Sequence, residues 1–304
     1  MTPAPHETLA DGSRAVVLDG GLSNALEERG QDLSGALWTA GVLRDRPEDV
    51  AAVHRAYYEV GARVATTASY QMSVPSLTAA GAGRAEAEGL LGRSVTVARA
   101  VRDALAADGV RRWVAASVGP YGAVLADGSE YRGRYGLGFA ALRDFHLPRL
   151  EVLAAAGPDL LAVETIPDVD EVAVLAGLLD EIGLPAWVSL SIDGDRTRAG
   201  QPLADALAVA AAPTCVVAVG VNCCAPGDVL PAVELAVATG KPAVVYPNSG
   251  EDWDATARDW TGGSSYDVAL AVDWVRAGAA YVGGCCRVGA DQVAALAASI
   301  ARHG

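Results

Sequence analysis

The chain alternates between short apolar runs and amphipathic helical segments from one end to the other, and this alternation limits the folds open to it. Several runs are nearly continuous in Val, Ala, Leu or Ile, which is typical of parallel strands buried on both faces. Between them, apolar residues recur at helical spacing, as Val50, Val53 and Tyr57 do. The eight expected strands are residues 14–19, 63–67, 113–118, 159–164, 186–191, 216–222, 242–246 and 280–283.

Eight strands alternating with helices predict a (β/α)8 TIM-type barrel of the α/β class. A length of 304 residues would suggest two domains at about 150 residues each, but α/β barrels often exceed that length as one domain. No low-complexity linker and no change of composition divides the chain. We therefore expect a single domain over residues 1–304, with an open, doubly wound sheet as the alternative architecture.

Charge and hydrophobicity narrow the class of protein. The chain carries 23 Lys and Arg against 37 Asp and Glu, for a net charge of −14, and this charge would repel the phosphate backbone of nucleic acids. No stretch approaches 18 consecutive apolar residues, so no membrane span is expected. Residues 1–14 lack a basic start followed by an apolar run, the pattern of a secretory signal. We expect a soluble, acidic, cytoplasmic globular protein.

Polar and special residues gather directly after the expected strands. In a barrel, the C-terminal ends of all strands face one rim, where active sites are built. Residues far apart in the sequence should therefore converge there. They are Asp19-Gly20-Gly21, Tyr70-Gln71, Gly119-Pro120-Tyr121, Glu164-Thr165, Asn222-Cys223-Cys224, Pro247-Asn248-Ser249 and Gly283-Gly284-Cys285-Cys286.

Four of the five cysteines form two adjacent pairs at strand ends, within or beside the runs GVNC at 220–223 and GGCCR at 283–287. An odd number of cysteines excludes a complete disulfide framework, and neighbouring cysteines rarely bond to each other. In a reducing compartment, such pairs favour metal or redox chemistry. We expect Gly283 and Gly284 to give the backbone the freedom that lets two adjacent thiolates reach one ion.

Three thiolates from two strand ends would leave one tetrahedral position open, which is the layout of a catalytic zinc site. Four would make a closed zinc or iron–sulfur site. If its strand continues, Cys224 points away from Cys223, and Cys215 precedes its strand and should be structural. The alternative is that small buried cysteines simply fill space beneath the loops.

These motifs resemble those of the zinc- and homocysteine-dependent methyltransferases, and in particular the stand-alone homocysteine S-methyltransferases that use S-methylmethionine or S-adenosylmethionine. The resemblance covers essentially the whole chain. Besides GVNC and GGCCR, it is carried by LDGGLSNALEERG (18–30), LWTAGVL (37–43), TASYQ (67–71), SVGPYGAVLADGSEYRG (117–133), ETIPDVDEV (164–172) and VVYPNSGE (244–251).

The resemblance implies a (β/α)8 barrel that holds one zinc ion per chain with Cys223, Cys285 and Cys286. It implies that Asp19 and Glu164 bind the amino-acid end of homocysteine. The alternatives are a loop cap for Asp19 and a buried ion pair with an arginine for Glu164. The substrate-binding set implied by the resemblance is Asp19, Gly20, Gly21, Tyr70, Glu164 and Asn248.

The chain departs from the family pattern at residues 23–25, where Ser-Asn-Ala stands and relatives more often carry a Thr-Glu pair. This departure concerns the substrate contacts near the first loop. For a cationic methyl donor, aromatic faces and polar groups should supply the contacts. The donor-side candidates are Tyr121, Asn248, Trp253 and Trp260.

The implied reaction transfers a methyl group from a sulfonium donor, S-methylmethionine or S-adenosylmethionine, to the thiolate of L-homocysteine and yields methionine. Betaine-dependent methylation by the same zinc site is one alternative. A non-catalytic metal-binding or redox protein is another, although it would not need acidic groups at the same rim. A zinc hydrolase would need a base positioned for water and usually has His or carboxylate ligands.

Overall fold

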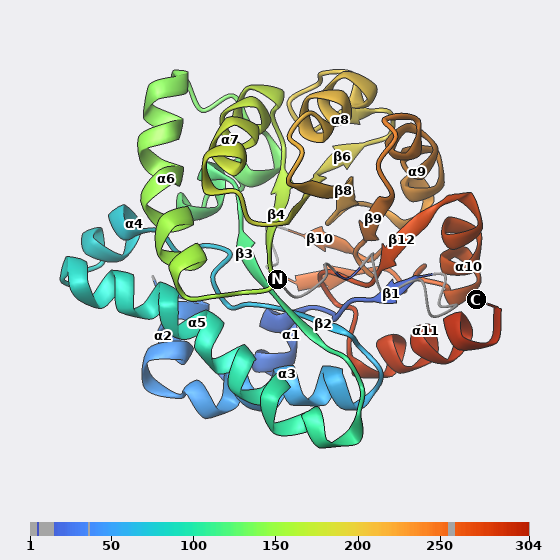
Figure 1. The fold of residues 1–304 in the computed structure, drawn as a ribbon, viewed down its shortest axis with the longest axis horizontal. Helices are drawn as coiled ribbons and strands as arrows, with labels where there is room; N and C mark the ends of the chain where they lie inside the picture. The colour runs from blue at the N-terminus through green and yellow to red at the C-terminus, as the bar shows by residue number, and fades with distance from the viewer. Residues whose placement is uncertain (1–4, 6–14, 36, 255–258, 304) are drawn as a thin grey trace.

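Eight parallel strands form one sheet in the order β1-β12-β9-β8-β5-β4-β3-β2 (Figure 1). The two ends of this sheet meet, because Leu18 bridges Val64 and the Arg63 N–H donates to the Val17 carbonyl at 2.7 Å. The sheet thus closes into the predicted barrel, and the open sheet is excluded. The strands are β1 (Val16–Val17), β2 (Val64–Thr66), β3 (Trp113–Val118), β4 (Leu160–Ile166), β5 (Ala186–Leu190), β8 (Val216–Asn222), β9 (Ala243–Tyr246) and β12 (Ala279–Val282).

The computed structural model describes residues 5, 15–35, 37–254 and 259–303, and of 252–254, 259–261 and 303 it describes the backbone alone. Helices surround the barrel as an outer ring (Figure 1). They are α1 (Leu22–Glu28), α2 (Thr39–Asp45), α3 (Pro47–Glu59), α4 (Val74–Ala79), α5 (Arg84–Leu105), α6 (Phe139–Ala155), α7 (Val169–Ile182), α8 (Leu203–Ala211), α9 (Val229–Ala238), α10 (Val268–Ala277) and α11 (Ala290–His303).

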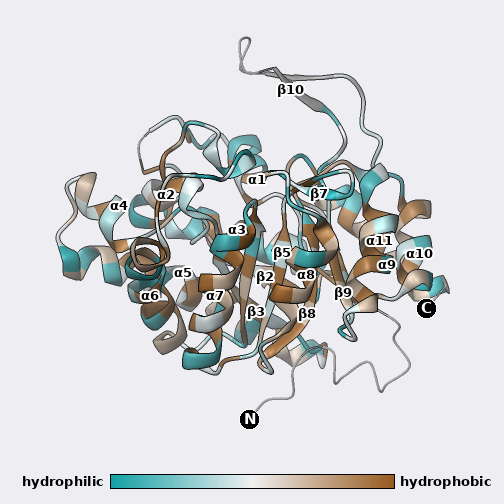
Figure 2. Cartoon of the chain, turned by 90° about the horizontal axis from the view of Figure 1, so that it is seen from above, coloured by the Kyte–Doolittle hydropathy of each residue, from teal (hydrophilic) through white to brown (hydrophobic). Residues whose placement is uncertain are grey.

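Alternation along the strands gives the barrel two apolar layers. On β4, Leu160 and Ala162 belong to a core cluster inside the barrel, whereas Leu161 and Val163 pack in the layer beneath the helices. Inside the barrel, Trp187 is fully buried beside two tyrosines. Figure 2 shows the consequence, with apolar strands at the centre and helices whose polar sides face outward.

The expected strand bounds agree with the observed ones to within two residues. The sequence patterns missed two short hairpins at the rim, β6 (Ile192–Asp193) with β7 (Arg196–Thr197), and β10 (Asp252–Asp254) with β11 (Asp259–Thr261). Segments of two or three residues are too short to show a periodic pattern.

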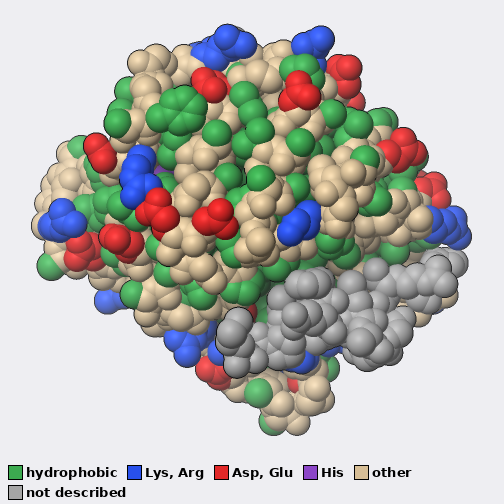
Figure 3. Space-filling view, turned by 45° about the horizontal axis from the view of Figure 1, so that its top comes forward, with side chains coloured by type: hydrophobic (Ala, Val, Ile, Leu, Met, Phe, Trp, Pro, Cys, Tyr) green, Lys and Arg blue, Asp and Glu red, His purple; other side chains and the backbone are tan. Residues whose placement is uncertain are grey.

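The surface carries charges of both signs. In Figure 3, basic and acidic side chains are interspersed among apolar ones over the visible face. Across the described ranges of the chain, none of the helices has the length and apolar content that crossing a bilayer requires.

Candidate metal and substrate site

Three cysteine sulfurs meet at the C-terminal rim of the barrel. Cys223 directly follows β8, and Cys285 and Cys286 follow β12, two strands away in the sheet. The three sulfurs lie within 4.8 Å of one another, and the Sγ atoms of Cys223 and Cys286 are 3.8 Å apart. Within the described residues, this is the one group of three or more His, Cys, Asp or Glu side chains close enough to share an ion.

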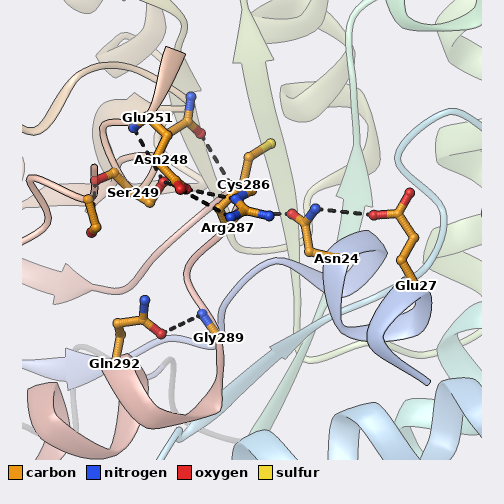
Figure 4. Close-up of polar contacts among 10 residues, drawn as sticks. Asn24, Glu27, Asn248, Ser249, Glu251, Cys286, Arg287, Gly289 and Gln292 are labelled. Carbon is orange, nitrogen blue, oxygen red and sulfur yellow. Dashed lines mark hydrogen bonds and ion pairs between the residues drawn. The ribbon is translucent and has the colours of Figure 1, made fainter. Parts of the chain in front are cut away.

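The loop after β9, which lies between β8 and β12, holds the cysteine backbones in place. The N–H of Cys223 donates to the carbonyl of Tyr246 at 3.2 Å, and that of Cys285 donates to the carbonyl of Pro247 at 2.8 Å. Asn248 Oδ1 accepts from the N–H of Cys286 at 3.2 Å (Figure 4). One loop therefore fixes cysteines that come from both of its neighbouring strands.

The two glycines before Cys285 have a different role from the one expected. Neither has a positive φ; instead, a Cβ on Gly284 would lie 2.1 Å from the Val288 side chain, and one on Gly283 would lie 2.6 Å from Cβ of Leu18. Glycine is required there because the chain packs closely. The left-handed backbone falls on Cys223 itself, at φ 51°.

The donor set fits a soft metal ion. Hydrogen bonds from Cys285 and Cys286 hold the pKa of Cys223 well below its usual value, while those of the other two thiols are raised. The hydroxyl of Tyr131 also lies 3.1 Å from the Cys223 sulfur. Three sulfur donors this close suit tetrahedral Zn²⁺ and leave one position for a further ligand.

The other two cysteines lie outside this cluster. Cys224 is 1 % exposed, packs in the outer apolar layer, and burial raises its pKa. Cys215 immediately precedes β8, at the opposite end of the strand from Cys223. Cys224 is separate from the cluster as expected, but not through strand alternation, because β8 ends at Asn222 and Cys223 has a left-handed backbone.

A cavity of about 230 Å³ opens beside the cysteines and reaches down to two buried carboxylates, Asp19 and Glu164. Asp19 accepts from the Thr66 backbone N–H at 2.6 Å and from its hydroxyl at 2.9 Å, so it also ties β1 to β2. Burial raises the pKa of Asp19 from 3.8 to about 7. This carboxylate combines a structural role with a place on the cavity wall.

Glu164 makes no ion pair with an arginine in the described part of the chain, contrary to the alternative considered from the sequence. Its carboxylate accepts a short hydrogen bond from the hydroxyl of Ser117. Burial raises its pKa from 4.5 to about 7, although the hydrogen bonds from Ser117 and Tyr246 oppose the shift. A buried carboxylate without a positive partner beside a cavity is suited to a cationic ligand.

The bend after Glu164 depends on Asn222, which the sequence placed at the rim but to which it gave no role. Asn222 Oδ1 accepts from the Thr165 N–H at 2.7 Å, and Asn222 Nδ2 donates to the Thr165 hydroxyl at 2.7 Å. Thr165 has a φ of 63°, and the β4–β5 register shifts between Val163 and Ile166. Asn222, the residue before Cys223, therefore fixes the backbone of Thr165, the residue after Glu164.

Two other expected substrate residues, Gly20 and Gly21, line the same cavity. A Cβ on Gly20 would lie 2.2 Å from the carbonyl of Val288, and one on Gly21 would lie 2.8 Å from that of Cys285. These glycines let the first loop approach the cysteine loop closely. Tyr70 lines the cavity as well.

The donor-side candidates are spread apart. Asn248 lines a second, larger cavity at the cysteines, whereas Tyr121 packs against Tyr135 and Phe145 and lines neither cavity. The side chains of Trp253 and Trp260 lie outside the described residues.

Two aromatic residues at the site went unrecognised in the sequence. Trp38 and Tyr131 line both cavities beside Cys223 and Cys286. The only signal for them was their place inside the motifs at 37–43 and 117–133.

The loop that carries Tyr131 is fixed by Glu171, a fully buried residue of α7. Glu171 accepts from the Tyr121 N–H at 2.6 Å and lies 2.8 Å from Nε2 of His146. His146 thus has a packing role, as does His54, and both are fully buried.

Comparison with known proteins gives one consistent result. The family model described as homocysteine S-methyltransferase matches residues 16–300. The homocysteine S-methyltransferase of Escherichia coli is 43 % identical over 303 residues, which cover 97 % of this chain and 98 % of that protein. Homocysteine S-methyltransferase 4 of maize is 45 % identical, over 93 % of this chain and 89 % of that protein.

Solved structures agree with the sequence comparison. The crystal structure of the E. coli homocysteine methyltransferase MmuM in its metallated form superposes with a TM-score of 0.87 at 40 % identity, covering 97 % of this chain and 99 % of that one. An oxidised form of the same protein matches equally well.

Proposed function

The chain belongs to the homocysteine S-methyltransferase family, and from that premise we propose that it methylates L-homocysteine with a sulfonium donor, S-methylmethionine or S-adenosylmethionine, to form methionine. Cys223, Cys285 and Cys286 would hold one zinc ion per chain. The observation that carries the proposal is a cavity with two buried carboxylates that opens directly onto the three sulfurs.

The chemistry needs a thiolate near neutral pH, whereas a free thiol titrates near about 8.5. Zinc held by the three cysteines would supply Lewis acidity that favours the thiolate form of homocysteine. The chain itself supplies binding and orientation. Glu164, with Asp19 beside it, offers negative charge for the substrate ammonium at the closed end of the cavity.

The transfer step is a simple displacement. A lone pair of the homocysteine sulfur forms a bond to the methyl carbon, while the bond from that carbon to the donor sulfonium breaks and its electron pair stays on the donor sulfur. The leaving group is a neutral thioether, so no general acid is required. The residues of the site need only hold the two sulfurs in line and exclude competing nucleophiles.

The assignment of partners follows from the same features. We propose residues 1–304 as one homocysteine-binding barrel domain that acts in the cytoplasm on small molecules and does not bind nucleic acid. The net charge of −14 supports the last point.

The test is an assay with purified reduced protein, homocysteine and each methyl donor in turn. Methionine formation from S-methylmethionine, at a rate well above that from betaine, would support the proposal. Higher catalytic efficiency with betaine would favour betaine-dependent methylation. Zinc binding without any methyl transfer would favour a metal-binding protein.

A further inference from the structure

We propose that the larger cavity at the cysteines is the methyl-donor subsite, and that Arg198 binds the α-carboxylate of the donor there. This inference rests on the proposed function and deepens it, because it names the residue that recognises the carboxylate of the donor. S-methylmethionine and S-adenosylmethionine both carry a free carboxylate and an ammonium group besides the sulfonium.

Two cavities meet at the three sulfurs. The smaller, of about 230 Å³, is lined by Asp19 and Glu164, and the larger, of about 760 Å³, adjoins it, since both share wall residues that include Cys223 and Cys286. A displacement in line requires the homocysteine sulfur, the methyl carbon and the donor sulfur to lie in one row, so the donor must occupy space that adjoins the thiolate. With homocysteine in the smaller cavity, the larger cavity is the adjoining space that can take the donor. The residues shared by both walls are Ser23, Asn24, Trp38, Tyr131, Cys223 and Cys286.

Arg198 is the one basic side chain on the described wall of the larger cavity. Its backbone is fixed, because its N–H donates to the carbonyl of Ser191 at 3.1 Å. Within the described residues its guanidinium has no hydrogen-bond or ion-pair partner, unlike that of Arg196, which donates to the carbonyl of Gly200 at 2.9 Å. A guanidinium on a fixed backbone with all of its donors available suits a carboxylate, which it can bind through two parallel hydrogen bonds.

The acidic side chains of the same cavity divide into paired and available groups. Both carboxylate oxygens of Glu251 accept hydrogen bonds from the Arg287 guanidinium, at 2.7 and 3.0 Å. Among the residues that the structure describes, Glu27 accepts one hydrogen bond, from Asn24 Nδ2 at 3.2 Å. Asp32 accepts from the backbone N–H of Ser34 at 2.9 Å. Figure 4 shows this row of contacts from Glu27 through Asn24 and Arg287 to Glu251. Glu27 and Asp32 therefore retain oxygen atoms for the cationic groups of a donor.

Two aromatic side chains stand where the cavities join. Trp38 and Tyr131 line both of them, and aromatic faces attract cations such as a sulfonium. Trp38 adopts φ 45° and ψ −125°, a backbone conformation that is costly for a bulky residue. A strained aromatic residue at the junction supports a function there rather than in packing alone.

The decisive experiment compares R198Q with the control R196Q, which alters the same hairpin at a position outside the cavity wall. The donors are S-methylmethionine and its carboxyl methyl ester, which keeps the sulfonium and the ammonium but loses the carboxylate charge. Arg198 is exposed, so solvent competes for its contact with a carboxylate. We therefore expect R198Q to lower kcat/KM for S-methylmethionine by about fivefold. For the ester, R198Q and the wild type should differ by less than twofold.

Equilibrium binding supplies a second readout. Titration calorimetry should show the same loss in affinity of R198Q for S-methylmethionine, with homocysteine affinity and zinc content equal to those of R196Q and the wild type. An unchanged donor affinity, or an equal loss for acid and ester, would overturn the assignment of Arg198 while leaving the proposed function intact. If the wild-type protein failed to methylate homocysteine with any sulfonium donor, the proposed function would be overturned, and this inference with it.

Discussion

Replacing Glu164 with Gln separates substrate recognition from metal binding. Gln keeps the shape and can still accept the hydrogen bond from Ser117, but it removes the charge that would face the ammonium of homocysteine. Glu164 is 7 % exposed, so little solvent competes for that contact. Loss of a hydrogen bond to a charged group costs about 1.5–3 kcal/mol, which is about 10- to 150-fold in Kd for homocysteine.

The same substitution should affect stability with the opposite sign. In the folded free protein the pKa of Glu164 is raised from 4.5 to about 7, so its ionised form is disfavoured there. Its contribution to stability is present below pH 4.5 and is lost as the pH rises through 7. At pH 8 the ionisation penalty is about 3–4 kcal/mol, since one pKa unit is worth about 1.4 kcal/mol. We expect E164Q, which has no such penalty, to be at least as stable as the wild type at pH 8.

The assay combines titration calorimetry, zinc analysis and denaturant unfolding at pH 5 and pH 8. A homocysteine analogue without the amino group should bind weakly to the wild type and lose little more in E164Q. The reasoning is refuted if E164Q binds homocysteine normally, or if it loses zinc together with homocysteine. A large loss of stability at pH 8 would instead show that Glu164 serves the fold.

Three further predictions concern the metal, Asn222 and the donor. Zinc and activity should both be lost in Cys223→Ala, Cys285→Ala and Cys286→Ala, as measured by metal analysis and methionine formation. The control Cys215→Ala should keep both, and a metal-free protein with full activity would contradict this prediction. Asn222→Ala should weaken homocysteine binding and lower the unfolding free energy by about 1–3 kcal/mol, because it leaves buried groups of the β4 bend unpaired; unchanged binding would contradict its role. S-methylmethionine should exceed betaine in kcat/KM, and the reverse order in a parallel assay would show that the donor assignment is wrong.

The sequence predicts the barrel well because its signal is repeated. Strands buried on both faces must be apolar throughout, and the bounds of β3 and β8 were predicted to the residue. The hairpins β6–β7 and β10–β11 were missed because such short segments leave no pattern.

The site was predictable only where chemistry restricts the residue type. Paired cysteines at strand ends indicate a metal site, because few other roles require them there. The sequence marked Asn222 only as a polar residue at a strand end, because its contact with Thr165 joins residues far apart in the sequence. Trp38 and Arg198 reach the cavity walls through the conformation of their loops, for which one sequence contains no signal. Gly283 and Gly284 show a related limit, since close packing and not backbone freedom requires glycine there.

Backbone strain is concentrated at this rim. Trp38, Thr165, Cys223 and Arg287 all have φ between 45° and 63°, a region unfavourable for residues with a side chain. The backbone N–H of each of the last three donates to a different element: Thr165 to Asn222 of β8, Cys223 to Tyr246 of β9, and Arg287 to Asn24 of α1. These contacts maintain the geometry before any ligand binds.

A site held in strained conformations should respond strongly to ligands that bind only the folded state. Zinc and homocysteine would both stabilise the fold by mass action, by about 2.7 kcal/mol for a ligand at one hundred times its Kd. Because the bonds that hold Thr165 and Cys223 both start from the end of β8, one strand positions both the carboxylate proposed for substrate binding and a sulfur proposed for metal binding. A displacement of that strand end would therefore disturb metal binding and substrate recognition together.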